Sequence, residues 1–413
     1  MNRQPERLAA AFVLAAGAWM AWPLSSRAAA PDSLAAVGTQ AVEPVPMPTD
    51  SSASRAGAPK ESFQQADWET LATVPDEARP ALVYGFRYNR VDGPAPTVGG
   101  AVRSERYANP LVYAKFTYAF SRERFLYDVG GEAPLGDHAR FRVGGAAYRR
   151  TETEDEWIVG ETENTLYALF ARTDYRDYYE ASGYEGRAAW DPGTDFGARV
   201  EGRIEDQRSL ENEANASLFG AHDRFRPNPP IEDGQDGVLA LGMRIGPAEI
   251  PPEGGTQGDV VYERAGDALH GDFDYGRVRA VVRTRVRLSP KQDARARLVG
   301  GSTLDGTLPP QKLWYLGGIS TLRGEDFKER QGDQFLLANA EYYLLVRKNV
   351  WGFGFLDWGS AWFGRDNLDR QQFLLDGGLG LRIGQGPLAL TAARNLQEAH
   401  AAIHVLVRFS ETF

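Results

Sequence analysis

From residue 80 onward, apolar and polar residues alternate along the chain with a period of two. In the clearest run, 277–288, one face carries Val278, Ala280, Val282, Thr284, Val286 and Leu288, and the other carries Arg277, Arg279, Arg283, Arg285 and Arg287. In a helix these arginines would spread around the axis and no apolar stripe would form. In a strand they form one polar column opposite one apolar column. The run therefore predicts a β-strand between a polar and an apolar environment.

The same alternation recurs over much of the chain, which favours a membrane barrel over a soluble sheet. It is found in residues 82–89, 112–120, 292–300, 335–347, 350–362, 373–383 and 403–413. Several of these runs reach the roughly 9–11 residues that cross a bilayer, longer than the ~5–6 residues of most soluble strands. At about twenty residues per strand and connection, residues 80–413 hold about 16 strands. We therefore predict an all-β protein, a transmembrane antiparallel β-barrel over 80–413. A soluble exported β-protein is the outside alternative.

The connections between the expected strands differ in length. Residues 207–234 and 304–331 are polar and rich in Pro or Gly, which predicts long loops. Residues 151–164 are predicted to form an acidic loop, and residues 164–179 fit either a helix or a strand. Long loops on one side and tight turns on the other are typical of outer-membrane barrels.

The N-terminal residues have a different character from the rest. Residues 1–28 resemble a secretory signal peptide, with Arg3 and Arg7 before an apolar stretch and a small-residue exit; a membrane anchor is the alternative interpretation. Residues 29–61 are predicted to be a disordered linker and residues 62–79 a short pre-barrel segment. Beyond the N-terminus no run approaches the ~20 apolar residues of a transmembrane helix. The mean hydropathy of −0.42 therefore excludes a helical membrane protein and leaves a barrel open.

The amino-acid composition argues against several classes of function. The net charge of −10 argues against a nucleic-acid partner. The chain has no cysteine, so no disulfide or thiolate metal site is expected. Its five histidines, His138, His222, His270, His400 and His404, stand in no catalytic motif. We therefore expect no enzyme activity, no cofactor and no metal. The acidic loop could bind calcium, but a solvated loop is the simpler interpretation.

Three motifs in the C-terminal third follow one another in a recognisable order. Residues 316–324 read Leu-Gly-Gly-Ile-Ser-Thr-Leu-Arg-Gly and precede a strand with Asn339-Ala340-Glu341. Residues 352–359 read Gly-Phe-Gly-Phe-Leu-Asp-Trp-Gly, and 378–382 read Gly-Leu-Gly-Leu-Arg. With the aromatic residues Phe409 and Phe413 on the last strand, this order resembles the BamA/TamA superfamily of outer-membrane barrels, also called bacterial surface antigen barrels.

The resemblance implies a lock between a loop and the barrel. Parity places Asp357, Arg382, Glu341 and the five arginines of 277–288 on the lumen side. The resemblance implies that the loop bearing Arg323 and Gly324 folds into the lumen, where Arg323 contacts Phe355 and Asp357. We expect Arg382 to join this network and the lock to hold the barrel shape. Glu325 departs from the family, which has an aromatic residue there.

The resemblance to this superfamily also implies a function. It implies a bacterial outer-membrane protein that acts in membrane biogenesis or in the export of a protein or lipid substrate. Phe409 and Phe413 would serve as the signal for the outer-membrane assembly machinery, with outer-membrane lipids and a separate periplasmic protein as further partners. Such a partner is expected because residues 29–79 are too few for the family's periplasmic POTRA domains. The alternative is a passive pore or structural protein. The luminal arginines would then make the pore selective for anions, unless carboxylates such as Glu341 and Asp357 neutralise the arginines.

Overall fold

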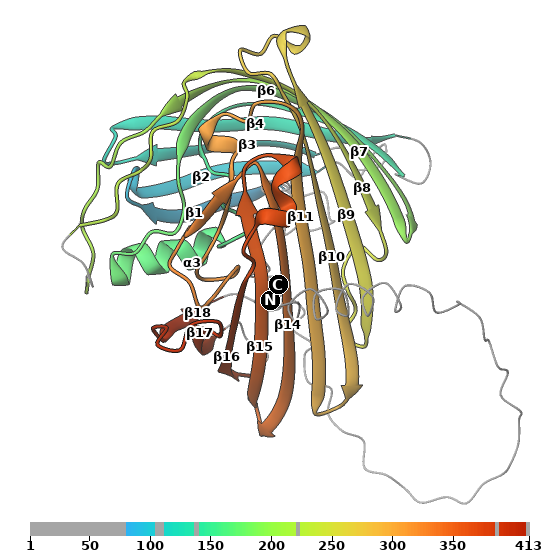
Figure 1. The fold of residues 1–413 in the computed structure, drawn as a ribbon. Coiled ribbons are helices and arrows are strands. Elements are labelled where there is room, and N and C mark those ends of the chain that lie inside the picture. The colour runs from blue at the N-terminus through green and yellow to red at the C-terminus, as the bar shows by residue number, and fades with distance from the viewer. Residues whose placement is uncertain (1–79, 104–110, 136–139, 220–223, 385–387, 410–413) are drawn as a thin grey trace, which may run out of the picture. The chain divides into compact units, whose positions relative to one another are not determined.

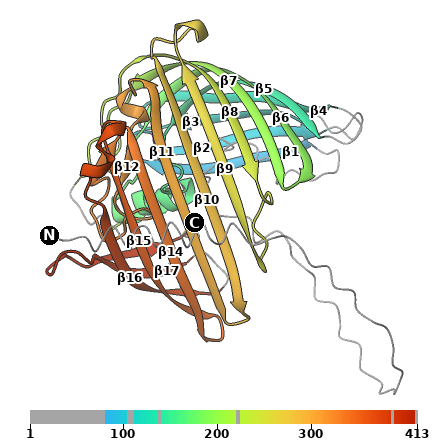
Figure 2. The same ribbon diagram turned by 45° about the vertical axis from the view of Figure 1, so that its right-hand side comes forward.

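The computed structural model describes residues 80–103, 111–135, 140–219, 224–384 and 388–409. In this part of the chain sixteen strands form one antiparallel sheet in chain order, and two short strands form a second sheet (Figures 1 and 2). The strands of the large sheet are β1 (Pro80–Asn89), β2 (Gly93–Arg103), β3 (Leu111–Ala119), β4 (Arg124–Leu135), β5 (Phe141–Glu152), β6 (Tyr179–Thr194), β7 (Phe196–Ser209), β8 (Gly234–Ile245), β9 (Gly254–Ala265), β10 (Tyr275–Ser289), β11 (Gln292–Gly306), β14 (Gln334–Arg347), β15 (Val350–Trp362), β16 (Leu374–Ile383), β17 (Ala389–Asn395) and β18 (His404–Arg408). The predicted barrel of about 16 strands is confirmed. The segments 1–28, 29–61 and 62–79 lie outside the described residues, so their assignments stay predictions.

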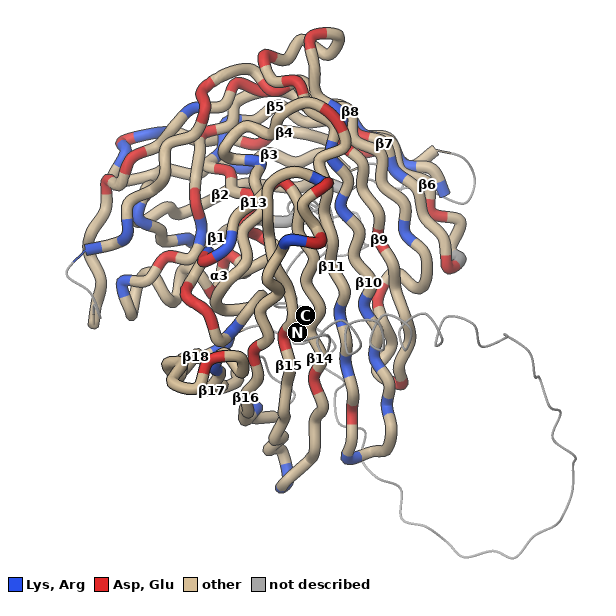
Figure 3. The backbone as a smooth tube through the Cα atoms, in the orientation of Figure 1, with Lys and Arg blue, Asp and Glu red and all other residues tan. Residues whose placement is uncertain are grey.

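Side chains on the large sheet are arranged inside out compared with a soluble protein. On β16, Leu379 is 72% exposed, whereas Asp376 is 0% and Arg382 is 4% exposed. Basic positions also follow β10 and β11 along their length (Figure 3). Apolar residues on the outer face and charged residues on the inner face fit a sheet that has lipid outside. This pattern supports the transmembrane barrel over a soluble sheet.

The connections are long at one end of the strands and short at the other. The long ones run over residues 153–178, 210–233 and 307–333. At the opposite end, one residue joins β6 to β7, and two residues, 290–291, join β10 to β11. Because outer-membrane barrels have short periplasmic turns and longer extracellular loops, we take the long connections to be extracellular.

The 153–178 connection carries the helical part of the fold. It holds α3 (Glu161–Leu166), followed by the π-helical turn η1 (Tyr167–Ala171). The region that fitted either helix or strand is therefore helical up to residue 171, and β6 starts only at Tyr179. The short 3-10 turns are η2 (Asp267–Leu269), η3 (Pro310–Lys312) and η4 (Arg365–Arg370). Of the helices in the described ranges, none is long and apolar enough to span a membrane.

The main hydrophobic core lies on the inner face of the sheet, where residues of two connections pack against inward-facing residues of the strands. Trp157 and Ile158 of the 153–178 connection pack with Trp314, Leu316 and other residues of the 307–333 connection. That second connection also contains β12 (Trp314–Leu316) and β13 (Arg330–Gly332), which pair with each other. Inward-facing residues of the large sheet, such as Val281, complete the cluster. The two connections therefore fold into the interior and pack against the strands.

The large sheet ends at β1 on one side and β18 on the other. Within the described residues, no backbone pairing joins these two strands. Helix α3 packs against β1 and also contacts β18. We call the boundary between β1 and β18, together with α3 and η1, the seam.

Candidate functional site: the loop lock and the seam

The 307–333 connection turns sharply before the predicted lock arginine. Gly317 and Gly318 have φ angles of 127° and 78°, in the left-handed region that glycine tolerates. The Gly317 amide donates to the Thr321 hydroxyl (2.8 Å) and the Gly318 amide to the Leu322 carbonyl (2.8 Å). These hydrogen bonds close the turn, after which Arg323 points toward β14 and β15.

Arg323 lies in a buried cage of two carboxylates and one aromatic ring. Its Nε and Nη2 donate to the two Asp357 carboxylate oxygens, each at 2.7 Å. Its Nη1 donates to Glu341 at 2.5 Å, and its guanidinium carbon lies 3.6 Å from the centre of the Phe355 ring. Burial alone would lower the pKa of Arg323. The neighbouring carboxylates of Asp357 and Glu341 raise it by more than burial lowers it, so the net shift of the pKa is upward. The guanidinium therefore stays charged although the side chain is only 1% exposed.

The backbone of the loop tip is held as closely as the arginine. The Gly324 amide donates to Asp376 at 2.7 Å. A Cβ at Gly324 would lie 2.4–2.8 Å from backbone atoms of residues 394–395, so only glycine fits there. Glu325, which replaces the family's aromatic residue, accepts a hydrogen bond from Asn395 at 2.5 Å. The departure in sequence therefore adds a polar contact to β17.

Further residues extend the lock on either side. Asn339 donates to Asp357 (2.7 Å) and to the Thr321 carbonyl (2.9 Å), while Arg297 donates to Asn339 (2.8 Å). Arg382 reaches the lock indirectly, because its Nη2 lies 3.5 Å from the Tyr343 hydroxyl, which in turn donates to Glu341. The structure thus brings together all the residues predicted for the lock. Their role in stability stays a prediction.

The arginines of β10 have other partners than the sequence suggested. Glu341 and Asp357 form ion pairs with Arg323 of the lock. The β10 arginines pair with carboxylates of β9 and β11, in the pairs Arg277–Glu263, Arg283–Asp259 and Arg285–Asp293. Arg287 donates to the carbonyls of Ser289 and Pro290. Luminal carboxylates therefore pair with these arginines, but they are residues of the neighbouring strands and not the two examples that the sequence suggested, because the sequence does not give the register between strands.

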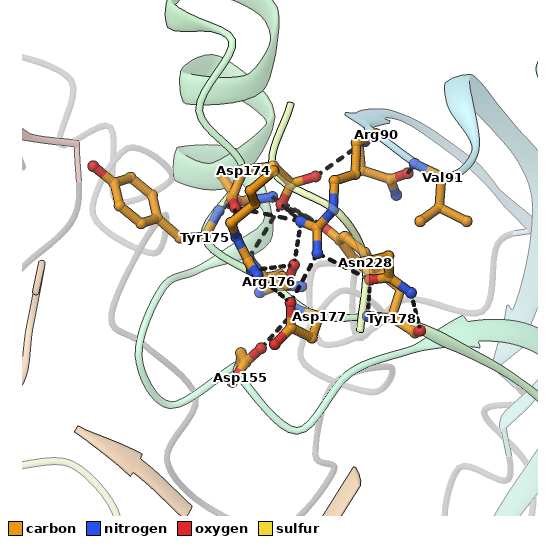
Figure 4. A network of polar contacts seen from close by, with 12 residues as sticks. Arg90, Val91, Asp155, Asp174, Tyr175, Arg176, Asp177, Tyr178 and Asn228 are labelled. Carbon is orange, nitrogen blue, oxygen red and sulfur yellow. Dashed lines mark hydrogen bonds and ion pairs between the residues drawn. The ribbon is translucent and has the colours of Figure 1, made fainter. Parts of the chain in front are cut away.

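A second polar hub lies where three connections meet (Figure 4). Arg90, in the turn between β1 and β2, is completely buried. Its guanidinium donates to Asp177 (2.8 Å), to Asn228 (2.9 Å) and to backbone carbonyls at Asp174 and Arg176. Its own amide donates to the Asp174 carboxylate at 3.0 Å. Arg90 therefore ties the first turn of the barrel to the 153–178 and 210–233 connections.

One lysine connects this hub to the 307–333 connection. Lys328 Nζ lies 2.7 Å from Asp155 and 2.5 Å from Asp177. Burial raises the pKa of Asp177, but Lys328, Arg226 and Arg90 outweigh it and bring the pKa to about 2. Burial and the neighbouring Asp177 raise the pKa of Asp155 despite Lys328. Asp177 is therefore the firmly charged partner of the lysine.

The seam is bridged by side chains of α3 and η1. Glu163 accepts hydrogen bonds from Arg408 Nε and from the Phe409 amide, both at 2.8 Å. Tyr167 donates to the Val407 carbonyl, and its ring packs edge-on against Phe409. On the other side, Thr165 Oγ1 accepts the Tyr88 amide of β1 at 3.2 Å. The side chains of Glu163 and Arg408 are each 1% exposed, so the two residues form a buried ion pair.

Sequence reasoning missed both the Arg90 hub and the seam contacts. Arg408 did carry a signal, because parity places it opposite the lipid-facing Val407 and Phe409, whose exposed fractions are 37% and 36%. A basic residue on the lumen side of the last strand calls for an acidic partner, but the sequence does not say which one. Phe413, the other predicted assembly-signal residue, lies outside the described residues.

Comparison with known proteins agrees with this geometry. Residues 78–241 match the C-terminal domain of a family of unknown function (DUF5686), and residues 249–402 match the Omp85 superfamily domain. BamA from Haemophilus ducreyi, in a crystal structure lacking POTRA domains 1–3, aligns with a TM-score of 0.55 at 12% identity, covering 80% of this chain and 69% of that one. CdiB from Acinetobacter baumannii aligns with a TM-score of 0.40 at 16% identity, covering 77% and 56%. No curated protein matches the sequence.

The Omp85 match covers β9 through β17, which include the strands that hold the lock, and the BamA likeness supports the fold of the sheet. The chain is therefore a bacterial outer-membrane β-barrel whose residues 249–402 match the Omp85 superfamily domain.

Proposed function

We propose that this barrel acts as an insertase or translocase, in outer-membrane biogenesis or in the export of a protein or lipid substrate. The observation that carries the proposal is the seam. A closed ladder between β1 and β18 would have to lose many backbone hydrogen bonds at once to open. Here the two strands are bridged by the side chains of Glu163, Thr165 and Tyr167. A barrel held this way has a preferred place to open sideways.

The hydrophobic core inside the sheet supports the same function over a passive pore. Two connections pack a hydrophobic core inside the sheet, and Arg323 fixes one of them to β14 and β15. A steady pore needs a continuous water-filled path. We therefore expect purified protein in planar bilayers to show at most small or intermittent currents. A large, steady, anion-selective current would favour the passive pore instead.

Cross-linking the seam tests the proposal. The chain has no cysteine, so pairs of thiols can be introduced without background. In Glu163→Cys/Arg408→Cys, a short bis-methanethiosulfonate reagent would fix α3 to β18. The matched control, Val129→Cys/Ala147→Cys, joins β4 and β5, which are already paired.

The expected result is a loss of function in the cross-linked seam variant, with recovery after a reductant. Function is read as rescue of a deletion strain, measured by its outer-membrane protein and lipid content. The cross-linked control should rescue like wild type. If the seam pair without cross-linker fails to rescue, Tyr167→Cys/Val407→Cys provides a second seam pair. Full rescue by a completely cross-linked seam would refute the proposal.

A further inference from the structure

Parts of two long connections cover the outer face of β1 at its long-loop end. Tyr84 and Phe86 point outward from β1 and are 80% and 55% exposed. Tyr88 belongs to the same outward column of side chains, yet it is only 3% exposed. It packs in a small apolar cluster with Ala168 of η1 and with Phe225 of the next long connection. The outer face of the sheet is therefore not left bare at this point.

The covered position lies at the height of an exposed aromatic group on the neighbouring strands. Tyr88 is paired with Pro94 of β2, and the Pro94 carbonyl accepts the amide of Phe120, which follows β3, at 3.1 Å. Phe120 is 54% exposed and Phe125 of β4 is 70% exposed. Both rings lie against the ring of Tyr118. Exposed aromatic rings near the ends of barrel strands are typical of the girdle at a membrane interface. The segment that covers Tyr88 therefore lies at the depth of this girdle.

The covering segment exposes large apolar side chains of its own. The Leu218 amide donates to the Leu169 carbonyl at 2.8 Å, which joins η1 to residues 216–219. The rings of Phe170 and Phe219 stack with their centres 6.1 Å apart. Phe170, Leu218 and Phe219 are 41%, 63% and 79% exposed. We call η1 together with residues 216–219 the flap.

The position of the flap indicates what its exposed side chains contact. Neighbouring exposed apolar side chains of this size mark an interaction site. The flap lies over Tyr88, so it continues the lipid-facing surface that Phe86 begins on the same strand. On its inner side, the Ala216 carbonyl accepts a hydrogen bond from the Tyr88 hydroxyl. A segment that binds the protein on one side and exposes apolar groups on the other suits the boundary between lipid headgroups and acyl chains.

We propose that the flap is an interfacial membrane anchor, which places Phe170, Leu218 and Phe219 among the lipids of the outer leaflet beside the seam. The occupant of this surface is lipid, because the surface is continuous with the lipid-facing side of β1 and lies at the depth of the aromatic girdle. The inference does not depend on the proposed function, since this contact with lipid would form whether or not the seam opens.

Fluorescence quenching in vesicles tests the anchor. The chain has no cysteine, so single thiols can be introduced into the full-length protein and labelled with one small fluorophore. The test position is Leu218→Cys, and the matched control is Glu211→Cys, an exposed residue of the same connection. Phe116→Cys, on the lipid-facing side of β3 and 50% exposed, serves as the reference for full lipid contact. The vesicles are phosphatidylcholine, in which part of the lipid carries a nitroxide quencher on the fifth carbon of one acyl chain, and iodide measures access from water.

We expect the nitroxide lipid to quench the Leu218→Cys label at least twofold more strongly than the Glu211→Cys label, and iodide to quench it less. Lipid quenching no stronger than at Glu211→Cys would overturn the proposal. Protection from iodide without quenching by lipid would also overturn it, because a protein partner would then cover the flap.

A second variant tests whether the side chains of the flap, and not the fluorophore, make the contact. Phe170→Asn/Phe219→Asn, combined with Leu218→Cys, should lose the lipid quenching and gain access to iodide. Heat-modifiability on a gel checks that this variant is folded; if it is not, Phe219→Asn alone takes its place, because that ring is 79% exposed. Unchanged lipid quenching in the folded variant would overturn the proposal.

Discussion

Replacing Arg323 with alanine is the most direct test of the lock. The substitution removes three hydrogen bonds to carboxylates and the contact with the Phe355 ring. It also leaves Asp357 and Glu341 at 0% side-chain exposure without the cation between them. Removing one partner of a buried ion pair costs about 3–5 kcal/mol, because the remaining charge is left uncompensated. We expect Arg323→Ala to lower the stability of the folded barrel by about this amount.

The assay is heat-modifiability on a gel, in which the folded barrel and the unfolded chain migrate differently. The temperature at which half of the protein unfolds should fall clearly, and less protein should assemble in the membrane. Arg323→Lys keeps the charge but loses the paired donors, so an intermediate loss is expected. Arg264→Ala, which removes an exposed pair with Asp274, should change stability by less than about 1 kcal/mol. If Arg323→Ala behaved like Arg264→Ala, the lock would not hold the barrel.

Three further predictions concern the loops. Gly324→Ala should destabilise the barrel by about 1–3 kcal/mol in the same assay, because its Cβ would overlap the backbone of 394–395; an unchanged midpoint would contradict the close approach. Arg90→Ala should open the long connections, seen as faster trypsin cleavage of intact cells. Asp177 has a folded pKa of about 2, below the ordinary value near 3.9. Its contribution is therefore present above about pH 4 and lost as the pH falls toward 2. Lys328→Met should move the acid transition in tryptophan fluorescence to higher pH, and an unmoved transition would argue against the ion pair.

The strands could be predicted from the sequence because their signal is local. Each strand shows its period of two within about ten residues, and the run 350–362 coincides with β15. The contact of Arg323 with Asp357 could be anticipated because two recognisable motifs carry the residues. Neither inference required the register between strands.

The parts that could not be predicted depend on distant or ambiguous segments. Glu163 and Arg408 are 245 positions apart, and neither stands in a motif. Arg90 binds residues up to 138 positions away. The partners of the β10 arginines follow from the pairing of β9 with β10, which alternation alone does not give. In each case tertiary structure selects one partner among several chemically equivalent ones.

The lock and the seam meet at the tip of the 307–333 connection. Arg408 of the last strand donates to the Ile319 carbonyl at 2.9 Å, only four residues before Arg323. The adjacent Ser320 hydroxyl donates to the Ile158 carbonyl of the connection that carries α3. Loosening the lock should therefore also disturb the partners of Glu163.

A double-mutant cycle with Arg323→Ala and Glu163→Gln tests this coupling. Residues in one polar network deviate from additivity by about 0.5–3 kcal/mol, whereas independent sites add within about 0.5 kcal/mol. We expect the first behaviour for this pair and the second for Glu163→Gln combined with Arg264→Ala. Additive losses in both cycles would mean that the loop lock and the seam act separately, so that movement of the lock loop could not be transmitted to the edge at which we propose that the barrel opens.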